Sequence, residues 1–183
     1  MKKTNDELVE FALSLTPHIL QAAKQFTEFT LQDNNYETEV SDKCFLETVI
    51  FILHIINRHV YSRINIEEER VFRGNLEIDT IEHIIKLSNV APLDQTILRS
   101  EYLQLLQKRT DIYRSFRIKD KGETPSNDLY MEFSKIIFRI MKKTSEKDGW
   151  DPIAVIKVNG DISLILANYP ILPSIDKFFI LKP

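Results

Sequence analysis

The sequence predicts a mainly α-helical fold, and two observations support this prediction. The 183-residue chain contains only 4 glycines and 7 prolines, too few for the tight turns of a many-stranded sandwich or barrel. Apolar residues recur along most of the chain at the three- and four-residue spacing of helices with one buried face. We therefore expect residues 1–183 to form a single domain, a bundle of about six or seven helices around a buried central helix.

The first predicted helix begins at a capping box formed by Thr4 and Glu7, whose side chains each bind a free backbone N–H. An apolar stripe then continues as far as Phe29. Pro17 interrupts this stripe, and we expect it to kink or restart the helix because proline lacks a backbone donor. The polar stretch 32–42 is the first predicted loop.

Residues 43–70 form the predicted central helix. Apart from His54, residues 49–56 are all apolar, so apolar side chains point in every direction around the helix axis. This pattern is typical of a helix that is buried on all sides. The acidic run 67–69 marks the predicted solvated end, and Gly74 follows as the expected stop.

Three further apolar stripes predict the helices that pack around the central one. They cover about residues 78–90, 92–118 and 126–143. Pro92 fits the first position of the second of these helices, where its missing N–H costs nothing. Gly122 falls in the break before the third.

The C-terminal part of the chain carries conflicting signals. Asp151 followed by proline is typical of a helix start, whereas the Asn-Gly pair ending at Gly160 is typical of a hairpin turn. We favour two short helices broken at Gly160, and a small β-hairpin at 153–166 is the alternative. Two prolines predict an extended apolar arm over 170–183, which must dock on its own domain or on a partner.

Composition narrows the classes of protein that this chain could belong to. A net charge of −3 argues against a nucleic-acid partner. The single cysteine, Cys44, excludes an internal disulfide. The longest apolar run, 44–56, is too short to span a bilayer and contains Glu47 and His54. We therefore expect a soluble, cytoplasmic protein without a membrane span.

Polar side chains on one face of the predicted central helix form the candidate ligand site. Glu47, His54 and Arg58 fall within about 40° of one line along the helix. A buried charge needs a partner or a ligand because its desolvation costs several kcal/mol. His54 and Arg58 lie one turn apart and could together bind an anion or carboxylate. The candidate ligand-binding residues are Glu47, His54, Arg58, Tyr61 and Tyr102.

The same pattern also has a structural interpretation, a buried salt-bridge network. From the sequence we favour this interpretation over a ligand site. A carboxylate from a facing helix would then neutralise Arg58, and a tyrosine hydroxyl would satisfy His54. The partners that this network requires are Glu101, Asp111 or Glu132 for Arg58, and Tyr102 or Tyr113 for His54.

The sequence contains no recognisable catalytic, metal or cofactor motif. It lacks the Glu-x-x-His pairs of di-iron bundles, the His-Glu-x-x-His zinc motif, and glycine-rich phosphate or dinucleotide loops. Cys44 and His54 would lie about 15 Å apart along one helix, so they cannot form a catalytic dyad. We expect no metal and no cofactor, and the absence of a catalytic motif favours a non-enzymatic role.

A basic cluster near the end of the helix predicted over 92–118 is a candidate anion or acidic-partner patch. Its members are Lys108, Arg109, Arg114 and Arg117. We favour a solvated helix end, where the helix dipole stabilises cations.

Two functional hypotheses follow from these features. The first is a binding or scaffold module that acts on another protein or on itself as a homodimer, suggested by the apolar C-terminal arm. The alternative is a small-molecule-binding or enzymatic helical bundle with its polar pocket at Glu47, His54 and Arg58.

Overall fold

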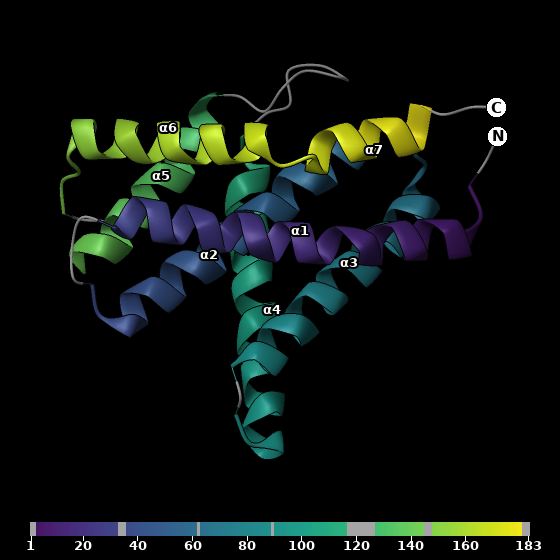
Figure 1. The fold of residues 1–183 in the computed structure, drawn as a ribbon, viewed down its shortest axis with the longest axis horizontal. Helices are drawn as coiled ribbons and strands as arrows, with labels where there is room; N and C mark the ends of the chain where they lie inside the picture. The colour runs from purple at the N-terminus through teal and green to yellow at the C-terminus, as the bar shows by residue number, and fades with distance from the viewer. Residues whose placement is uncertain are drawn as a thin grey trace.

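The computed structural model describes residues 3–32, 36–61, 63–88, 90–116, 127–144 and 148–180. These residues form one all-α domain of seven helices, without a strand among them (Figure 1). The helices are α1 (Asn5–Leu31), α2 (Thr38–Tyr61), α3 (Ile66–Leu87), α4 (Pro92–Arg114), α5 (Asn127–Lys142), α6 (Pro152–Asn168) and α7 (Ile171–Ile180).

Helix α1 begins at the predicted capping box. The Glu7 N–H donates to the Thr4 hydroxyl at 3.2 Å, and the Thr4 N–H donates to the Glu7 carboxylate at 2.7 Å. The predicted restart at Pro17 is wrong, since α1 continues through this residue. Leu15 and Ile19 on either side of it are buried in the same core, so tertiary packing offsets the lost backbone hydrogen bond.

The helix predicted over 43–70 is in fact two helices. Helix α2 ends at Tyr61, and Asn65 caps a new helix by accepting the Glu67 and Glu68 N–H groups at 3.0 Å. The acidic run is therefore the first turn of α3, where the helix dipole favours carboxylates. The predicted stop at Gly74 is also wrong, because α3 continues through it and absorbs the helix expected over 78–90.

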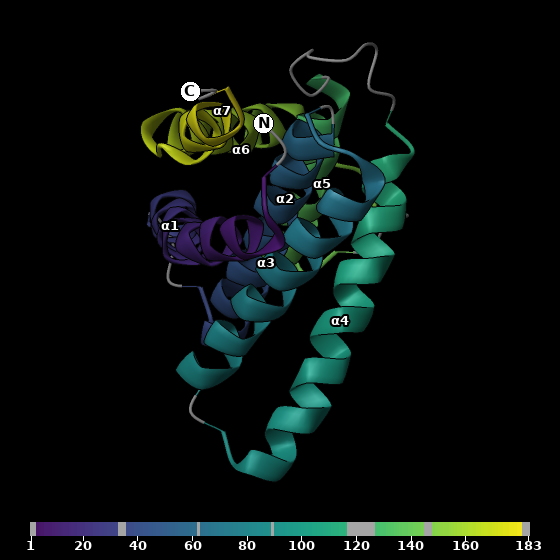
Figure 2. The same cartoon turned by 90° about the vertical axis from the view of Figure 1, so that its right-hand side faces the viewer.

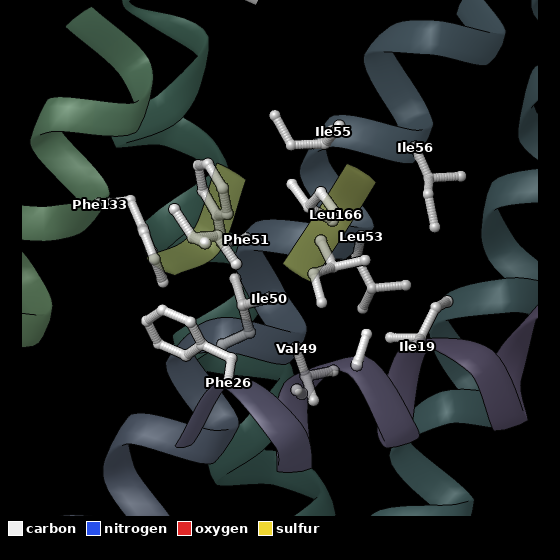
Figure 3. Packing of buried hydrophobic residues seen from close by; sticks show 14 of the residues in the cluster. Ile19, Phe26, Val49, Ile50, Phe51, Leu53, Ile55, Ile56, Phe133 and Leu166 are labelled. Carbon is white, nitrogen blue, oxygen red and sulfur yellow. The ribbon is translucent and has the colours of Figure 1, made fainter. Parts of the chain in front are cut away.

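Helix α2 contributes a large share of the hydrophobic core. Every residue over 47–56 is buried, and α2 packs against α1, α3, α4, α5 and α7. Phe51 stacks on Phe133 of α5 with ring centroids 4.1 Å apart, and Phe26 of α1 meets the same ring at 5.6 Å (Figure 3). This packing places the polar face of α2 against α4.

Helix α6 overturns both expectations for residues 151–168. Its N-cap is Asp151, as predicted, but it continues unbroken through Gly160, so the break and the hairpin at 153–166 are both wrong. Its buried residues are Val155, Val158, Asp161, Ile162, Ile165 and Leu166. Their helical spacing lets α6 pack on α1 and α5, whereas a two-stranded hairpin is marginal by itself.

The predicted extended arm over 170–183 is helical as far as Ile180, and residues 181–183 lie outside the described part. Pro173 occupies the first turn of α7, where no intrahelical N–H bond is lost. Ile175 is fully buried, and Phe178 stacks on Phe11 of α1 at 3.9 Å. The apolar arm therefore docks on its own domain.

Helices α3 and α4 extend together away from the other helices (Figure 2). Pro92 is the first residue of α4, as predicted, and α5 lies within one residue of its predicted bounds at each end. Helix α4 ends at Arg114 rather than at residue 118, and Gly122 is outside the described residues. No helix among the described residues is both long and apolar enough to cross a membrane.

Candidate functional site

Glu47, at the N-terminal end of the polar face of α2, belongs to a polar network with α4. Its side chain is buried, with the residue only 2% exposed. One carboxylate oxygen accepts the Tyr113 hydroxyl at 2.9 Å, and the other accepts the Arg109 Nε–H at 2.8 Å. The buried ion pair on this face of α2 therefore joins Glu47 to Arg109, a pair that the sequence analysis did not predict.

Burial dominates the ionisation of this network. It raises the pKa of the Glu47 carboxyl, while the Arg109 guanidinium and the Tyr113 hydroxyl oppose that shift. Burial also raises the pKa of Tyr113 well above its usual range, which keeps its hydroxyl protonated as a donor. Each Glu47 oxygen thus accepts a hydrogen bond from a side chain of α4.

A cavity of about 590 Å³ lies farther along α2, between the end of that helix, the start of α3 and the end of α4. We call it the arginine cavity. Its lining residues are His54, Asn57, Arg58 and Tyr61 from α2; Ile66, Glu69, Arg70 and Arg73 from α3; Thr110 and Arg114 from α4; and Phe116. Of the predicted ligand residues, His54, Arg58 and Tyr61 line the cavity, whereas Glu47 and Tyr102 do not.

Arg58 joins the end of α2 to the end of α4. Its Nη2 donates to the Tyr113 carbonyl at 2.9 Å and also to the Phe116 carbonyl. These carbonyls belong to the C-terminal end of α4, where a cation is favoured. Its Nη1 is buried and has no hydrogen-bond partner among the described residues.

Neither predicted partnership for Arg58 and His54 occurs. Arg58 forms no ion pair with Glu101, Asp111 or Glu132, all of which are described. The hydroxyl of Tyr113, one of the two tyrosines expected to satisfy His54, donates to Glu47 instead.

His54 is 7% exposed, and its ring lies 5.3 Å from the Tyr113 ring. Its Nε2 atom is buried, and no group in the described part of the chain bonds to it. Burial lowers the pKa of His54 to about 3, and the positive charges of Arg58 and Arg114 add to this effect. The imidazole is therefore neutral at neutral pH.

Asn57 completes a group of three incompletely bonded side chains. Its Nδ2 donates to Glu77 at 2.9 Å, while its Oδ1 is buried without a donor. In the described part of the chain, four buried side-chain polar atoms lack a partner, and three of them belong to residues that line the arginine cavity. Buried polar groups are normally satisfied, so these three side chains have hydrogen-bonding capacity that no described group uses.

The arginine cavity has an excess of positive charge. Four arginines and one glutamate line it, which leaves a net charge of +3 with His54 neutral. Arg73 is paired with Glu69 at 3.2 Å. Arg70 and Arg114 are exposed and form no ion pair with the described residues. The cavity therefore favours an anionic occupant.

The predicted basic cluster is divided by the tertiary structure. Arg109 binds Glu47, Arg114 lines the arginine cavity, and Lys108 is exposed on α4 away from it. Arg117 lies outside the described residues. Sequence reasoning missed Arg70 because α3 was merged with α2; the Asn-x-x-Glu capping signature beginning at Asn65 would have separated the two helices.

A second cavity of about 500 Å³ provides a contrast. It lies beside the start of α2, α4 and the end of α5. Four cations and one glutamate also line this cavity. Each of these cations, however, has a carboxylate partner within the chain: Lys43 has Glu39 at 2.5 Å, Lys143 has Glu37 at 2.8 Å, Arg109 has Glu47 at 2.8 Å, and Arg139 has Glu132 at 3.9 Å. Positive charge without a carboxylate partner is thus a feature of the arginine cavity.

Comparison with known proteins gives no match to a family model, to a curated protein or to a solved structure. Within the described residues, no group of three or more His, Cys, Asp or Glu side chains could hold a metal ion. Burial raises the pKa of Cys44 to about 12, so its thiol is protonated and unreactive at neutral pH. Functional inference therefore proceeds from the chemistry of the arginine cavity.

Proposed function

We propose that the arginine cavity binds a small organic anion with a carboxylate or phosphate group. The observation that carries this proposal is the presence of unpartnered buried polar atoms on His54, Asn57 and Arg58 around one cavity with excess positive charge. Its volume of about 590 Å³ lies within the usual size range of small-molecule sites.

Each lining group has a distinct role in this proposal. The free Nη1 of Arg58 donates to the anionic group, assisted by the guanidinium groups of Arg70 and Arg114. Guanidinium suits this task because its planar donors match the geometry of carboxylate and phosphate. The Oδ1 of Asn57 accepts from a donor on the ligand, and the aromatic side chain of Phe116 contacts its apolar part.

Binding accounts for this site better than acid–base chemistry. A general base works best when its pKa is near the working pH, and the pKa of His54 is about 3. The neutral imidazole instead supplies one hydrogen-bonding nitrogen inside the cavity. An anion beside His54 would raise this pKa by offsetting the charges of Arg58 and Arg114.

The test is calorimetric titration of the full chain with inorganic phosphate, benzoate and phenyl phosphate at constant ionic strength. We expect phenyl phosphate to bind most tightly, because it combines the anionic group with an aromatic ring. Arg114→Gln removes a charge-assisted hydrogen bond and should weaken binding by about 10- to 100-fold. Lys108→Gln is the matched control, since it removes the same charge from the same helix outside the cavity.

Two results would overturn the proposal. The first is that none of the three probes binds more tightly than chloride. The second is that Lys108→Gln weakens binding as much as Arg114→Gln does, which would indicate general attraction of anions rather than a site.

A further inference from the structure

Helix α6 has an exposed apolar stripe on its outer face. The stripe consists of Ile153, Ile156, Gly160, Leu164 and Ala167, all exposed and all within an arc of about 80° around the helix. Ile153 is 80% exposed, Ile156 61% and Leu164 53%. The opposite side of α6 is buried against α1 and α5, and α6 lies along the edge of the molecule (Figures 1 and 2). Apolar side chains thus lie on both the buried and the outer side of α6.

Other exposed apolar residues do not form such a stripe. On α3, Ile66, Ile78 and Leu87 are exposed, but each lies at least nine residues, or about 13 Å, from the next along the helix. On α4, Ile97 and Leu103 are likewise on different faces. Single exposed apolar residues are common on protein surfaces, whereas contiguous ones mark an interaction site.

The spacing within the α6 stripe is the same in both chain directions. From Ile153 to Ala167 the steps are three, four, four and three residues, with Gly160 at the centre. An antiparallel copy of the helix therefore presents the same pattern. Crossing at Gly160 places Ile156 beside the partner's Leu164 and Ile153 beside the partner's Ala167. Such self-complementarity is the requirement of a twofold interface.

Gly160 suits the crossing point of two helices. A Cβ atom at this position would meet nothing within 4 Å, so nothing in its own chain explains why a glycine interrupts an exposed helix. Glycine destabilises a helix interior, but it allows another backbone to approach closely. Lys157 borders the stripe and is ion-paired with Asp161 at 3.2 Å. Across the twofold axis, Lys157 would lie opposite the partner's Ser163, so no like charges meet.

We propose that the α6 stripe is a homodimer interface in which the α6 helices of two copies cross antiparallel on a twofold axis at Gly160. The occupant of this face is thus a second copy of the chain, bound through α6 and not through residues 170–183. A single helix pair belongs to the small, transient class of interfaces, so a reversible dimer is expected.

Cysteine cross-linking tests the geometry. Gly160→Cys places two thiols at the twofold axis and should give a covalent dimer under mild oxidation. Cys44 does not interfere because it is buried. Ile156→Cys should cross-link poorly, since its two copies would lie about 12 Å apart along the axis, beyond the reach of a disulfide. Ile78→Cys, exposed on α3, is the control for random collision.

The cross-linking results discriminate sharply. The proposal fails if Gly160→Cys forms dimer no faster than Ile78→Cys. It also fails if Ile156→Cys cross-links as well as Gly160→Cys, because a parallel pair would give that result.

Sedimentation equilibrium of the unmodified chain provides an independent measurement. We expect a monomer–dimer equilibrium that Ile156→Glu shifts at least about tenfold toward monomer, because each dimer would bury two carboxylates in an apolar contact. Ile78→Glu should leave the equilibrium unchanged. A chain that stays monomeric at the highest soluble concentration contradicts the proposal, as does equal weakening by both variants. Neither outcome bears on anion binding in the arginine cavity.

Discussion

Glu47 and His54 lie seven residues apart on the same face of α2, yet they have opposite surroundings. Both side chains are buried, and both contact Tyr113 of α4. Glu47 has a partner for each carboxylate oxygen. His54 has a buried ring nitrogen without one, beside a cavity whose excess charge is positive.

The difference shows that burial of a polar residue does not by itself mark a site. Where α4 packs closely on α2, its side chains complete the hydrogen bonds of Glu47. Toward the end of α4, Arg58 bonds only to backbone carbonyls through its Nη2, and its Nη1 lacks an acceptor among the described residues. The proposed binding site thus lies where the buried polar face of α2 continues past the partners that the neighbouring helices provide.

The largest expected effect comes from breaking the polar network around Glu47. Glu47→Ala leaves the Arg109 charge and the Tyr113 hydroxyl without their acceptor, and should lower the free energy of unfolding by about 3–5 kcal/mol. Glu69→Ala is the matched control at the arginine cavity, where a partly exposed ion pair contributes less than about 1 kcal/mol. Urea unfolding of both variants measures the contrast. Equal losses would show that the two regions do not differ in the way described.

The second effect concerns the pH dependence contributed by His54. Its folded-state pKa of about 3 lies below the unfolded value, so the unfolded chain takes up a proton first as the pH falls below about 6.5. The charged groups around it are Arg58 on α2, Glu69, Arg70 and Arg73 on α3, and Arg114 on α4.

His54 therefore stabilises the fold above about pH 6.5, and this contribution is lost as the pH falls toward 3. The loss is about 1.4 kcal/mol per pH unit, or about 2 kcal/mol by pH 5. His54→Leu removes the titration, so the stability of this variant relative to the parent chain should rise by that amount between pH 7 and pH 5. Urea unfolding at the two values provides the check, and parallel pH profiles would contradict it.

The smallest expected effect is the change in stability when positive charge is removed from the arginine cavity. Replacing Arg70 and Arg114 together with glutamine should stabilise the protein by up to about 0.5 kcal/mol at low salt, because two like charges leave a positive cavity. High salt should remove the gain by screening. Thermal or urea unfolding at two salt concentrations measures it. A loss of more than about 1 kcal/mol would mean that these arginines hold the fold together.

Local signals in the sequence were sufficient for much of the fold. The capping box at Thr4 and the N-cap at Asp151 are satisfied by backbone N–H groups within one helical turn, and Pro92 at the start of α4 depends only on its own position in the helix. Interactions of such short range depend little on the rest of the chain. The α-helical class follows from apolar periodicity for the same reason, because periodicity is a property of the segment itself.

Glycine and proline were poor guides to the breaks. Gly74 and Gly160 lie inside helices, and α1 continues through Pro17. Each of these residues weakens a helix by at most a few kcal/mol, and burial of neighbouring apolar side chains offsets that cost. The low glycine and proline content therefore correctly predicted that the chain has few turns, but it did not predict where they lie.

The candidate site was accessible from the sequence only in part. Helical spacing on α2 identified Glu47, His54 and Arg58 as a buried polar face, because those side chains share one helix. Which of them would find partners depended on α3 and α4. The side chains of these helices that contact α2 are more than ten residues away from it in the sequence. Tertiary packing alone decided that Arg109 closes the network at Glu47 and that Arg70 and Arg114 border a cavity beside His54. Spacing along one helix is a local property, whereas the pairing of a buried charge depends on which other helix lies opposite it.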